Sequence, residues 1–193
     1  MSDALYIVEY SRISRGIVVL DRMRKRSGIT ALYAAPVCIG KYVIAVGGDV
    51  GDVREAKTEA DGLADGMLSS YFISGAHPDV MGYFTRAPNR VPGSPEAVGI
   101  FETRNISSGF VSLDAALKSG STEILKIWMG HFIGGKFCWI LSGEVSEVSS
   151  ALQAAERTLS GKEIAGSELI PRPDASVTAL FKSSSASIMR TGE

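Results

Sequence analysis

The chain has 193 residues, of which 45% are hydrophobic, and its 20 basic and 21 acidic residues give a formal net charge of −1. This composition excludes a disordered chain, and near-neutrality argues against nucleic acid as the main partner, because phosphate binding needs a basic face. We expect no membrane span and no export signal, and two cysteines are too few for a disulfide framework, which favours a reducing compartment.

Hydrophobic periodicity predicts six elements in the first half of the chain. A strand is expected over Ala4–Tyr10, with further strands near Thr30–Ala35, Tyr42–Val46 and Tyr71–Ser74. Apolar residues at helical spacing predict two helices. Their apolar stripes are Ile13, Ile17, Leu20 and Met23 for the first helix, and Val53, Ala56, Ala60, Leu63 and Met67 for the second.

The second half repeats this order of elements. Strands are expected over Ala97–Thr103, on both sides of Gly134-Gly135, and near Glu168–Ile170. Two helices are again indicated by apolar residues at helical spacing. Their stripes are Phe110, Leu113 and Leu117, and then Val145, Val148, Leu152, Ala155 and Leu159.

Direct sequence matches show that the two halves are copies of one unit. At an offset of 93 residues, Ile7-Val8-Glu9 corresponds to Ile100-Phe101-Glu102, Gly16 to Gly109, and Leu20-Asp21 to Leu113-Asp114. At an offset of 95, Gly40-Lys41 corresponds to Gly135-Lys136, and Gly48-Asp49-Val50 to Gly143-Glu144-Val145. Five matches in order, with one change of offset, indicate an internal duplication.

The order β-α-β-β-α-β in each copy predicts an α+β protein of two tandem ferredoxin-like domains. We place the first domain at residues 1–90 and the second at 95–182, with a proline-rich linker near 87–95. The serine-rich residues 183–193 are expected to form a flexible tail.

Signals for an enzyme are scarce. The only histidines, His77 and His131, occupy non-equivalent places in the two copies, and zinc-protease, nucleophile-elbow and phosphate-loop motifs are missing. We therefore expect a protein that is not an enzyme. His77 is expected at a turn or an edge, and His131 as a polar residue of a loop or strand, although a pore-lining contact with a proton or metal is open for His131.

The turns between the central strands carry more information. They are Pro36–Lys41 in the first copy and Gly130–Lys136 in the second, and both are unusually apolar and rich in small residues. Free surface turns are normally polar. Such turns suit a place where they meet copies of themselves around a symmetry axis, although ordinary tight hairpins would also explain them.

Several of these segments resemble bacterial microcompartment (BMC) shell proteins. The likeness spans residues 4–181 and leaves only the tail. It rests on Ala4–Glu9, Ile13–Gly16, Leu20-Asp21, Ala97–Glu102, Leu113–Lys118, Gly134–Lys136, Gly143–Val145 and Ile170–Pro173. Both halves keep the unpermuted order of elements, so the chain looks like a tandem-domain member of this family.

The resemblance implies a pseudo-hexameric homotrimer that serves as a tile of a microcompartment shell in the bacterial cytoplasm. It implies contacts with other shell proteins through tile-edge residues, which match Lys25, Lys118 and Arg172 here. It also implies a central pore where three chains meet. The pore-lining residues would be Val37, Cys38, Ile39, Gly40, Ile133, Gly134 and Gly135.

Cys38 matches a cysteine that, in the family member most like this chain, binds an iron–sulfur cluster shared by three chains. The resemblance therefore implies a 4Fe-4S cluster at the pore, used for electron transfer across the shell, and an encapsulated redox enzyme as a possible partner. Ile39 stands where that relative has proline, so a rigid φ is lost and the sulfur can shift. Cys38 could instead be an unligated pore residue, bind another metal or form a disulfide.

Two further functions remain open at this point. The tile could have a plain metabolite pore without a cluster, or the ferredoxin-like fold could belong to a regulator that binds a small molecule. Cys138 lies within a predicted strand and is expected to be a buried structural thiol.

Overall fold

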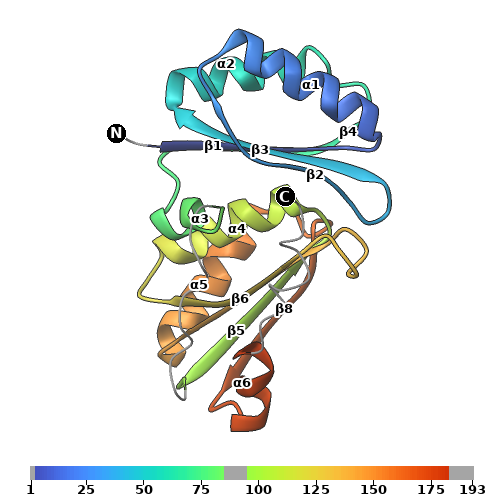
Figure 1. Cartoon of the computed structure of the whole chain (residues 1–193). Coiled ribbons are helices and arrows are strands. Elements are labelled where there is room, and N and C mark those ends of the chain that lie inside the picture. The colour runs from blue at the N-terminus through green and yellow to red at the C-terminus, as the bar shows by residue number, and fades with distance from the viewer. Residues whose placement is uncertain (1–2, 85–94, 183–193) are drawn as a thin grey trace.

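A computed structural model describes residues 3–84 and 95–182, which form two domains of similar design (Figure 1). The expected linker, apart from Pro95, and the expected tail lie outside the described residues. The first domain contains β1 (Asp3–Tyr10), α1 (Ile13–Arg26), β2 (Thr30–Val37), β3 (Lys41–Asp49), α2 (Val50–Asp61), β4 (Met67–Ile73) and α3 (Pro78–Gly82). The second contains β5 (Ala97–Thr103), α4 (Ile106–Lys118), β6 (Glu123–Met129), β7 (Phe137–Gly143), α5 (Val145–Thr158), β8 (Ile164–Pro171) and α6 (Ala175–Lys182).

Each domain has one antiparallel sheet of four strands, in the order β2-β3-β1-β4 in the first and β6-β7-β5-β8 in the second. The α+β, ferredoxin-like prediction is therefore confirmed in both halves. The strand registers also repeat, because Leu5 pairs with Ile73 as Val98 pairs with Ile170. Residues can thus be matched between the domains one by one.

The predicted apolar stripe of α1 is wrong in part. Ile13 and Ile17 are 41% and 51% exposed, and the residues that α1 buries are Gly16, Val19 and Met23. Gly16 lets α1 approach the ring of Tyr42 closely, as Gly109 lets α4 approach Phe137. The glycine is therefore not the cause, because the counterparts of Ile13 and Ile17 on α4, Ile106 and Phe110, are fully buried beneath the first domain. Within the described residues, Ile13 and Ile17 on α1 face solvent instead.

Two predictions for the first domain need a similar correction. The helix α2 ends at Asp61, so Leu63 and Met67 lie beyond it, and Met67 begins β4. The short helices α3 and α6 were not predicted. Each follows the last strand of its domain. His77 is the N-cap of α3, and its Nδ1 accepts a hydrogen bond from the Asp79 N–H at 3.2 Å. His77 was expected at a turn or an edge, and the structure gives it the related role of a helix N-cap.

The two domains pack through unlike surfaces. One face of the first sheet is covered by α1 and α2, and the opposite face lies on α4 of the second domain (Figure 1). Leu5, Ile7 and Val43 from that sheet share one apolar core with Ile106 and Phe110 of α4. The first sheet is thus covered on both faces within a single chain.

A buried carboxylate lies within this contact. Glu9 is fully buried, and its Oε1 accepts hydrogen bonds from the N–H and the hydroxyl of Ser107, at 2.8 and 2.9 Å. Ser107 lies in the first turn of α4, where the helix dipole favours a negative charge. The ammonium of Lys41 lies 3.4 Å from Glu9 Oε2 and neutralises the buried charge.

Among the described residues, no helix combines the length and the apolar character that crossing a membrane would require.

Replacing Glu9 by Ala should lower the free energy of unfolding by about 3 kcal/mol, because Ser107 and Lys41 would lose a buried acceptor. Glu9→Gln should lower it less, since the amide oxygen still accepts from Ser107. Urea unfolding at a fixed protein concentration measures both. Asp61→Ala is the control, because its surface pair with Lys57 contributes at most about 1 kcal/mol. Equal losses for Glu9→Ala and Asp61→Ala would contradict this account.

Gly109→Ala should lower the free energy of unfolding by about 2 kcal/mol, because the new methyl group would overlap the buried ring of Phe137. Gly51→Ala is the matched control in α2, where a methyl group meets open space. That substitution should raise stability by about 0.5 kcal/mol through its effect on the unfolded chain. Thermal or urea unfolding of the two variants should give shifts of opposite sign, and shifts of one sign would count against close helix–sheet packing.

Candidate functional site

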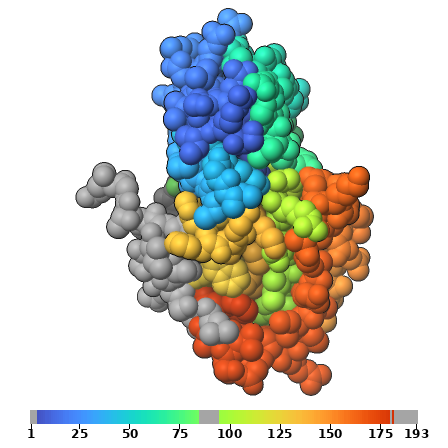
Figure 2. Space-filling view, turned by 90° about the vertical axis from the view of Figure 1, so that its right-hand side faces the viewer, coloured from blue at the N-terminus to red at the C-terminus, as the bar shows by residue number. Residues whose placement is uncertain are grey.

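The two apolar hairpins of one chain lie against each other. The first joins β2 to β3 and the second joins β6 to β7, and Figure 2 shows the light-blue segment of the first in contact with the gold segment of the second. A side chain at Gly135 would overlap the carbonyl oxygen of Cys38, and one at Gly130 would approach Val37 within 2.9 Å. Both glycines also have positive φ values, 74° and 71°. The close approach therefore depends on residues without a Cβ.

Cys38 lies at this contact. It is a free, half-buried cysteine, and its Sγ accepts a hydrogen bond from the N–H of Phe132 at 3.4 Å. The second domain thus supplies a donor to the sulfur of the first. Hydrogen bonds to sulfur of this kind also occur at metal-bound cysteines.

The tips of both hairpins are apolar and exposed. Ile39 is 81% exposed and Phe132 is 86% exposed. Phe132 also has a φ of 61°, a left-handed conformation that is uncommon for a side chain of its size. Sequence reasoning did not include Phe132 among the pore residues. The repeat contained the signal, since Phe132 occupies the place in the second hairpin that Ile39 has in the first.

The hairpins differ in length by two residues. Before the turns, Pro36 and Met129 pair with equivalent residues of the facing strands, and their sequence numbers differ by 93. After the turns, the sequence numbers of the equivalent residues Gly40 and Gly135 differ by 95. The insertion is therefore in the turn of the second hairpin, which contains Ile133 and Gly134. His131 takes the position that Cys38 has in the first hairpin. The expected loop position of His131 is confirmed.

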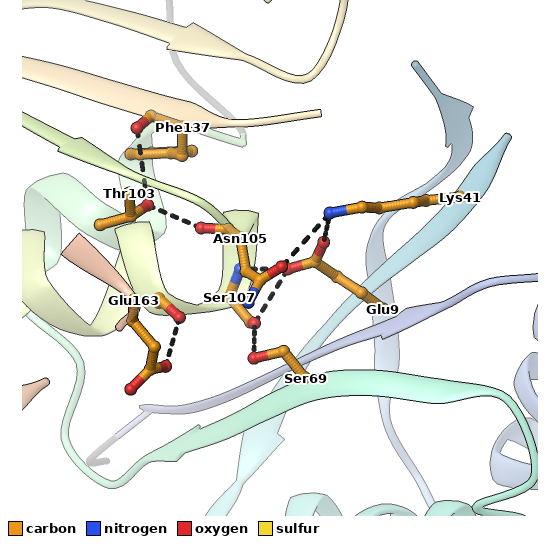
Figure 3. A network of polar contacts seen from close by, with 9 residues as sticks. Glu9, Lys41, Ser69, Thr103, Asn105, Ser107, Phe137 and Glu163 are labelled. Carbon is orange, nitrogen blue, oxygen red and sulfur yellow. Dashed lines mark hydrogen bonds and ion pairs between the residues drawn. The ribbon is translucent and has the colours of Figure 1, made fainter. Parts of the chain in front are cut away.

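A polar network supports the base of the first hairpin (Figure 3). The ammonium of Lys41 lies 3.2 Å from the side-chain oxygen of Asn105 and also contacts Glu9. The hydroxyl of Ser107 donates to Glu9 and lies 2.8 Å from the Ser69 hydroxyl. Residues from β1, β3 and β4 are thereby connected to the start of α4. The network fixes the first hairpin relative to the second domain.

A second polar contact joins the domains nearby. The Tyr71 hydroxyl donates to Oε1 of Glu163 at 2.7 Å, and Ser108 donates to the same oxygen at 2.7 Å. Burial alone would raise the pKa of the Glu163 carboxyl, but hydrogen bonds from Ser108, Tyr71 and Ser160 lower it below its usual value. Burial and the neighbouring carboxylate raise the pKa of Tyr71 to about 12. Glu163 is therefore an anionic acceptor at neutral pH.

No group of three or more His, Cys, Asp or Glu residues within the described part of the chain is placed to hold a metal ion. Cys138 is half-buried in β7, and burial followed by the charge of Glu102 raises the pKa of its thiol to about 11. It therefore remains protonated at neutral pH, as suits the structural role predicted for it. Its burial is only partial.

The three predicted tile-edge residues lie on the surface away from the hairpins. Lys25 pairs with Asp21 at 2.7 Å, and Lys118 pairs with Asp114 at 2.6 Å, each across one helical turn. The two ion pairs are equivalent at the offset of 93. Arg172 is exposed, has a φ of 49°, and donates its N–H to the carbonyl oxygen of Glu96 at 2.7 Å. None of these three side chains is part of the buried core.

Similar proteins point to one family. The chain is 31% identical over 179 residues, 92% of this chain and 96% of the relative, to the bacterial microcompartment shell protein PduT of Citrobacter freundii. It also matches a solved microcompartment protein from Desulfitobacterium hafniense DCB, with 31% identity and a TM-score of 0.80 over 93% of this chain and 99% of that chain. A fused permuted hexameric shell protein of the RMM microcompartment shares the fold at 18% identity, with a TM-score of 0.59 over 81% of each chain.

The family model of the BMC domain matches this chain twice, over residues 4–76 and 97–173. The two matches coincide with the two four-stranded sheets and the helices that cover them. The relative that matches over 92% of this chain is a microcompartment shell protein. The chain therefore belongs to the BMC domain family of bacterial microcompartment shell proteins.

Proposed function

We propose that the protein is a structural tile of a microcompartment shell in the bacterial cytoplasm, and that three chains form a pseudo-hexameric ring around a central pore. The observation that carries this proposal is the pair of hairpins at one end of the domain interface, whose apolar tips, Ile39 and Phe132, are exposed. Apolar tips on a rigid base suit a place where several copies meet. A ring also needs head-to-tail contacts that close, and the unlike surfaces joining the two domains are contacts of this kind.

We further propose that three Cys38 residues bind one 4Fe-4S cluster at the pore. One chain offers a single thiolate there, so the donor set fits the cluster only when three chains contribute. Such clusters normally take four thiolate ligands, so one iron would use a ligand from outside the protein. When bound, the cluster would supply one-electron transfer across the shell.

The chain's own residues prepare this site. The N–H of Phe132 donates to the Cys38 sulfur and orients it. The close approach of Gly135 to the Cys38 carbonyl and the network at Lys41 hold the hairpin in place. The exposed Ile39 and Phe132 would shield the thiolates from water, which strengthens charge interactions inside the ring.

The proposed tile also has partners. Lys25, Lys118 and Arg172 lie on the surface, where they would contact other shell proteins at tile edges. Each edge contact can be weak, because a tile makes several at once and their effects accumulate. An encapsulated redox enzyme is the partner that would exchange electrons with the cluster.

The cluster is tested with anaerobically purified protein. We expect about four iron and four sulfide per trimer in the wild type and none in Cys38→Ser, because a hydroxyl is a poor ligand for these irons. Cys138→Ser is the matched control and should keep its iron, since its thiol is protonated and belongs to strand β7, outside the turn that carries Cys38. Mass measurement of all three proteins should give a trimer.

A colourless, iron-free wild type that still forms trimers would reject the cluster and leave a tile with a plain pore. Equal iron in wild type and Cys38→Ser would remove Cys38 as a ligand. A monomer at all concentrations, with a melting temperature that shifts on addition of one small molecule, would favour the ferredoxin-like regulator.

A further inference from the structure

The second domain has a pocket at the end of its sheet that lies opposite the hairpin. The pocket is found where β5 and β6 begin and β7 ends (Figure 1), and its volume is about 320 Å³. Pockets that hold small molecules start at about this size. The polar residues that line it are Glu96, Ser121, Glu123, Ser142 and Glu144.

Strand register places the charged side chains on one face of the sheet. Glu123 pairs with Ser142 between β6 and β7, and Ser142 pairs with Val98 between β7 and β5. Side chains alternate along extended backbone, so Glu144 lies on the face of Ser142, and Glu96 on the face of Val98. The three carboxylates therefore flank a single opening.

These carboxylates have no counter-ion. Within residues 3–84 and 95–182, the side chains of Glu96, Glu123 and Glu144 form no ion pair and no hydrogen bond. Arg172 is near in the fold, because its backbone N–H donates to the Glu96 carbonyl oxygen, but its guanidinium pairs with none of the three. Like charges around one opening repel each other, so a bound cation would be favourable there.

Ser142 is an independent sign of a ligand. It lines the pocket and is only 3% exposed, and its hydroxyl makes no hydrogen bond to any residue that the structure describes. Buried hydroxyl groups normally have a partner, and the lack of one is destabilising. Because Ser142 and Glu123 lie side by side on one face, an N–H donor in the pocket can reach both.

The first domain fills the equivalent place with an apolar side chain. Gly47 and Thr30 are the register counterparts of Ser142 and Glu123. A Cβ at Gly47 would lie 3.1 Å from the Met81 side chain of α3, which is closer than side chains normally pack. The second domain thus has a hydroxyl and an extra carboxylate where the first has a glycine, a threonine and a packed methionine.

The pocket suits an organic cation better than a metal ion. Its carboxylates flank a wide opening, and no group of three metal-binding side chains in the described part of the chain converges on one point. An alkylammonium or guanidinium group is larger and has several N–H donors, so it can serve separate acceptors at once. The N-terminus of α5 at Glu144 contributes about half a positive charge, which three carboxylates outweigh.

We propose that this pocket binds a small organic cation that carries an alkylammonium or guanidinium group. An N–H of the ligand donates to the Ser142 hydroxyl, Glu123 balances its charge, and Glu96 and Glu144 add attraction at the opening. The pocket lies at the far end of the domain from the hairpins. It therefore adds a binding activity to the proposed tile and depends neither on the ring nor on the cluster.

Agmatine, which has one guanidinium and one ammonium group, is the probe for this site. Calorimetric titration of the full chain at low ionic strength should show saturable binding that weakens with added salt, because the contact is ionic. Ser142→Ala should weaken binding about tenfold through the loss of a hydrogen bond to a charged group. Glu123→Gln should weaken it about threefold through the loss of one charge.

A matched pair of variants separates the pocket from acidic residues in general. Glu144 precedes α5 as Asp49 precedes α2, and neither side chain caps its helix. Glu144→Gln should weaken agmatine binding about threefold, whereas Asp49→Asn, in the domain where Met81 fills the space, should bind as wild type does. Equal effects of the two substitutions, or a wild type that binds no agmatine, would overturn the inference and leave the proposed tile intact.

The same cationic groups occur on Lys and Arg side chains, and sedimentation equilibrium distinguishes the two sources. Self-association that agmatine leaves unchanged would identify the ligand as a free small molecule, as proposed. A fall of about threefold or more in self-association, both with agmatine and in Glu123→Gln, would overturn that assignment and seat a basic side chain of another copy in the pocket.

Discussion

The structure depends on burying an apolar sheet face that its own domain leaves uncovered. In the first domain α1 and α2 cover one side of the sheet, and Leu5, Ile7 and Val43 on the other side need a partner. The second domain provides α4, and a shared apolar core forms. Hydrophobic burial is non-directional, so the orientation comes from polar contacts between the domains, of Glu9 with Ser107 and of Tyr71 with Glu163. The two hairpins meet because this contact holds their domains at a fixed angle.

The order of elements follows from the sequence because strands and helices of this size are marked by periodicity and by the repeat. The sequence predicts less well which face of each helix is buried. Ile13 and Ile17 form a good apolar stripe but are exposed on α1, whereas their counterparts Ile106 and Phe110 on α4 are buried beneath the first domain. The hydrophobicity of one helix cannot reveal this difference, since both helices carry the same pattern and differ in what packs on them. The stripe on α1 remains informative, because it marks a surface that the single chain leaves uncovered.

The sequence predicted which two loops form the candidate site, but it did not predict how their residues contact each other. Small apolar turns and Cys38 are visible in the sequence. The donor to the Cys38 sulfur is the N–H of Phe132, 94 residues away, and Phe132 itself adopts a left-handed φ. No local pattern indicates such a pairing. Comparison of the two copies position by position is the one route by which Phe132 could have been found in advance.

The second hairpin has His131 at the position where the first hairpin has Cys38. This difference between the two copies affects how such a protein can evolve. In a ring of six identical subunits every mutation near the axis appears six times, and six thiols would crowd one small ligand. Fusing two copies into one gene halves that multiplicity. One copy can then acquire a reactive group while its sibling keeps the ring closed, so duplication separates the evolution of chemistry from the maintenance of shape.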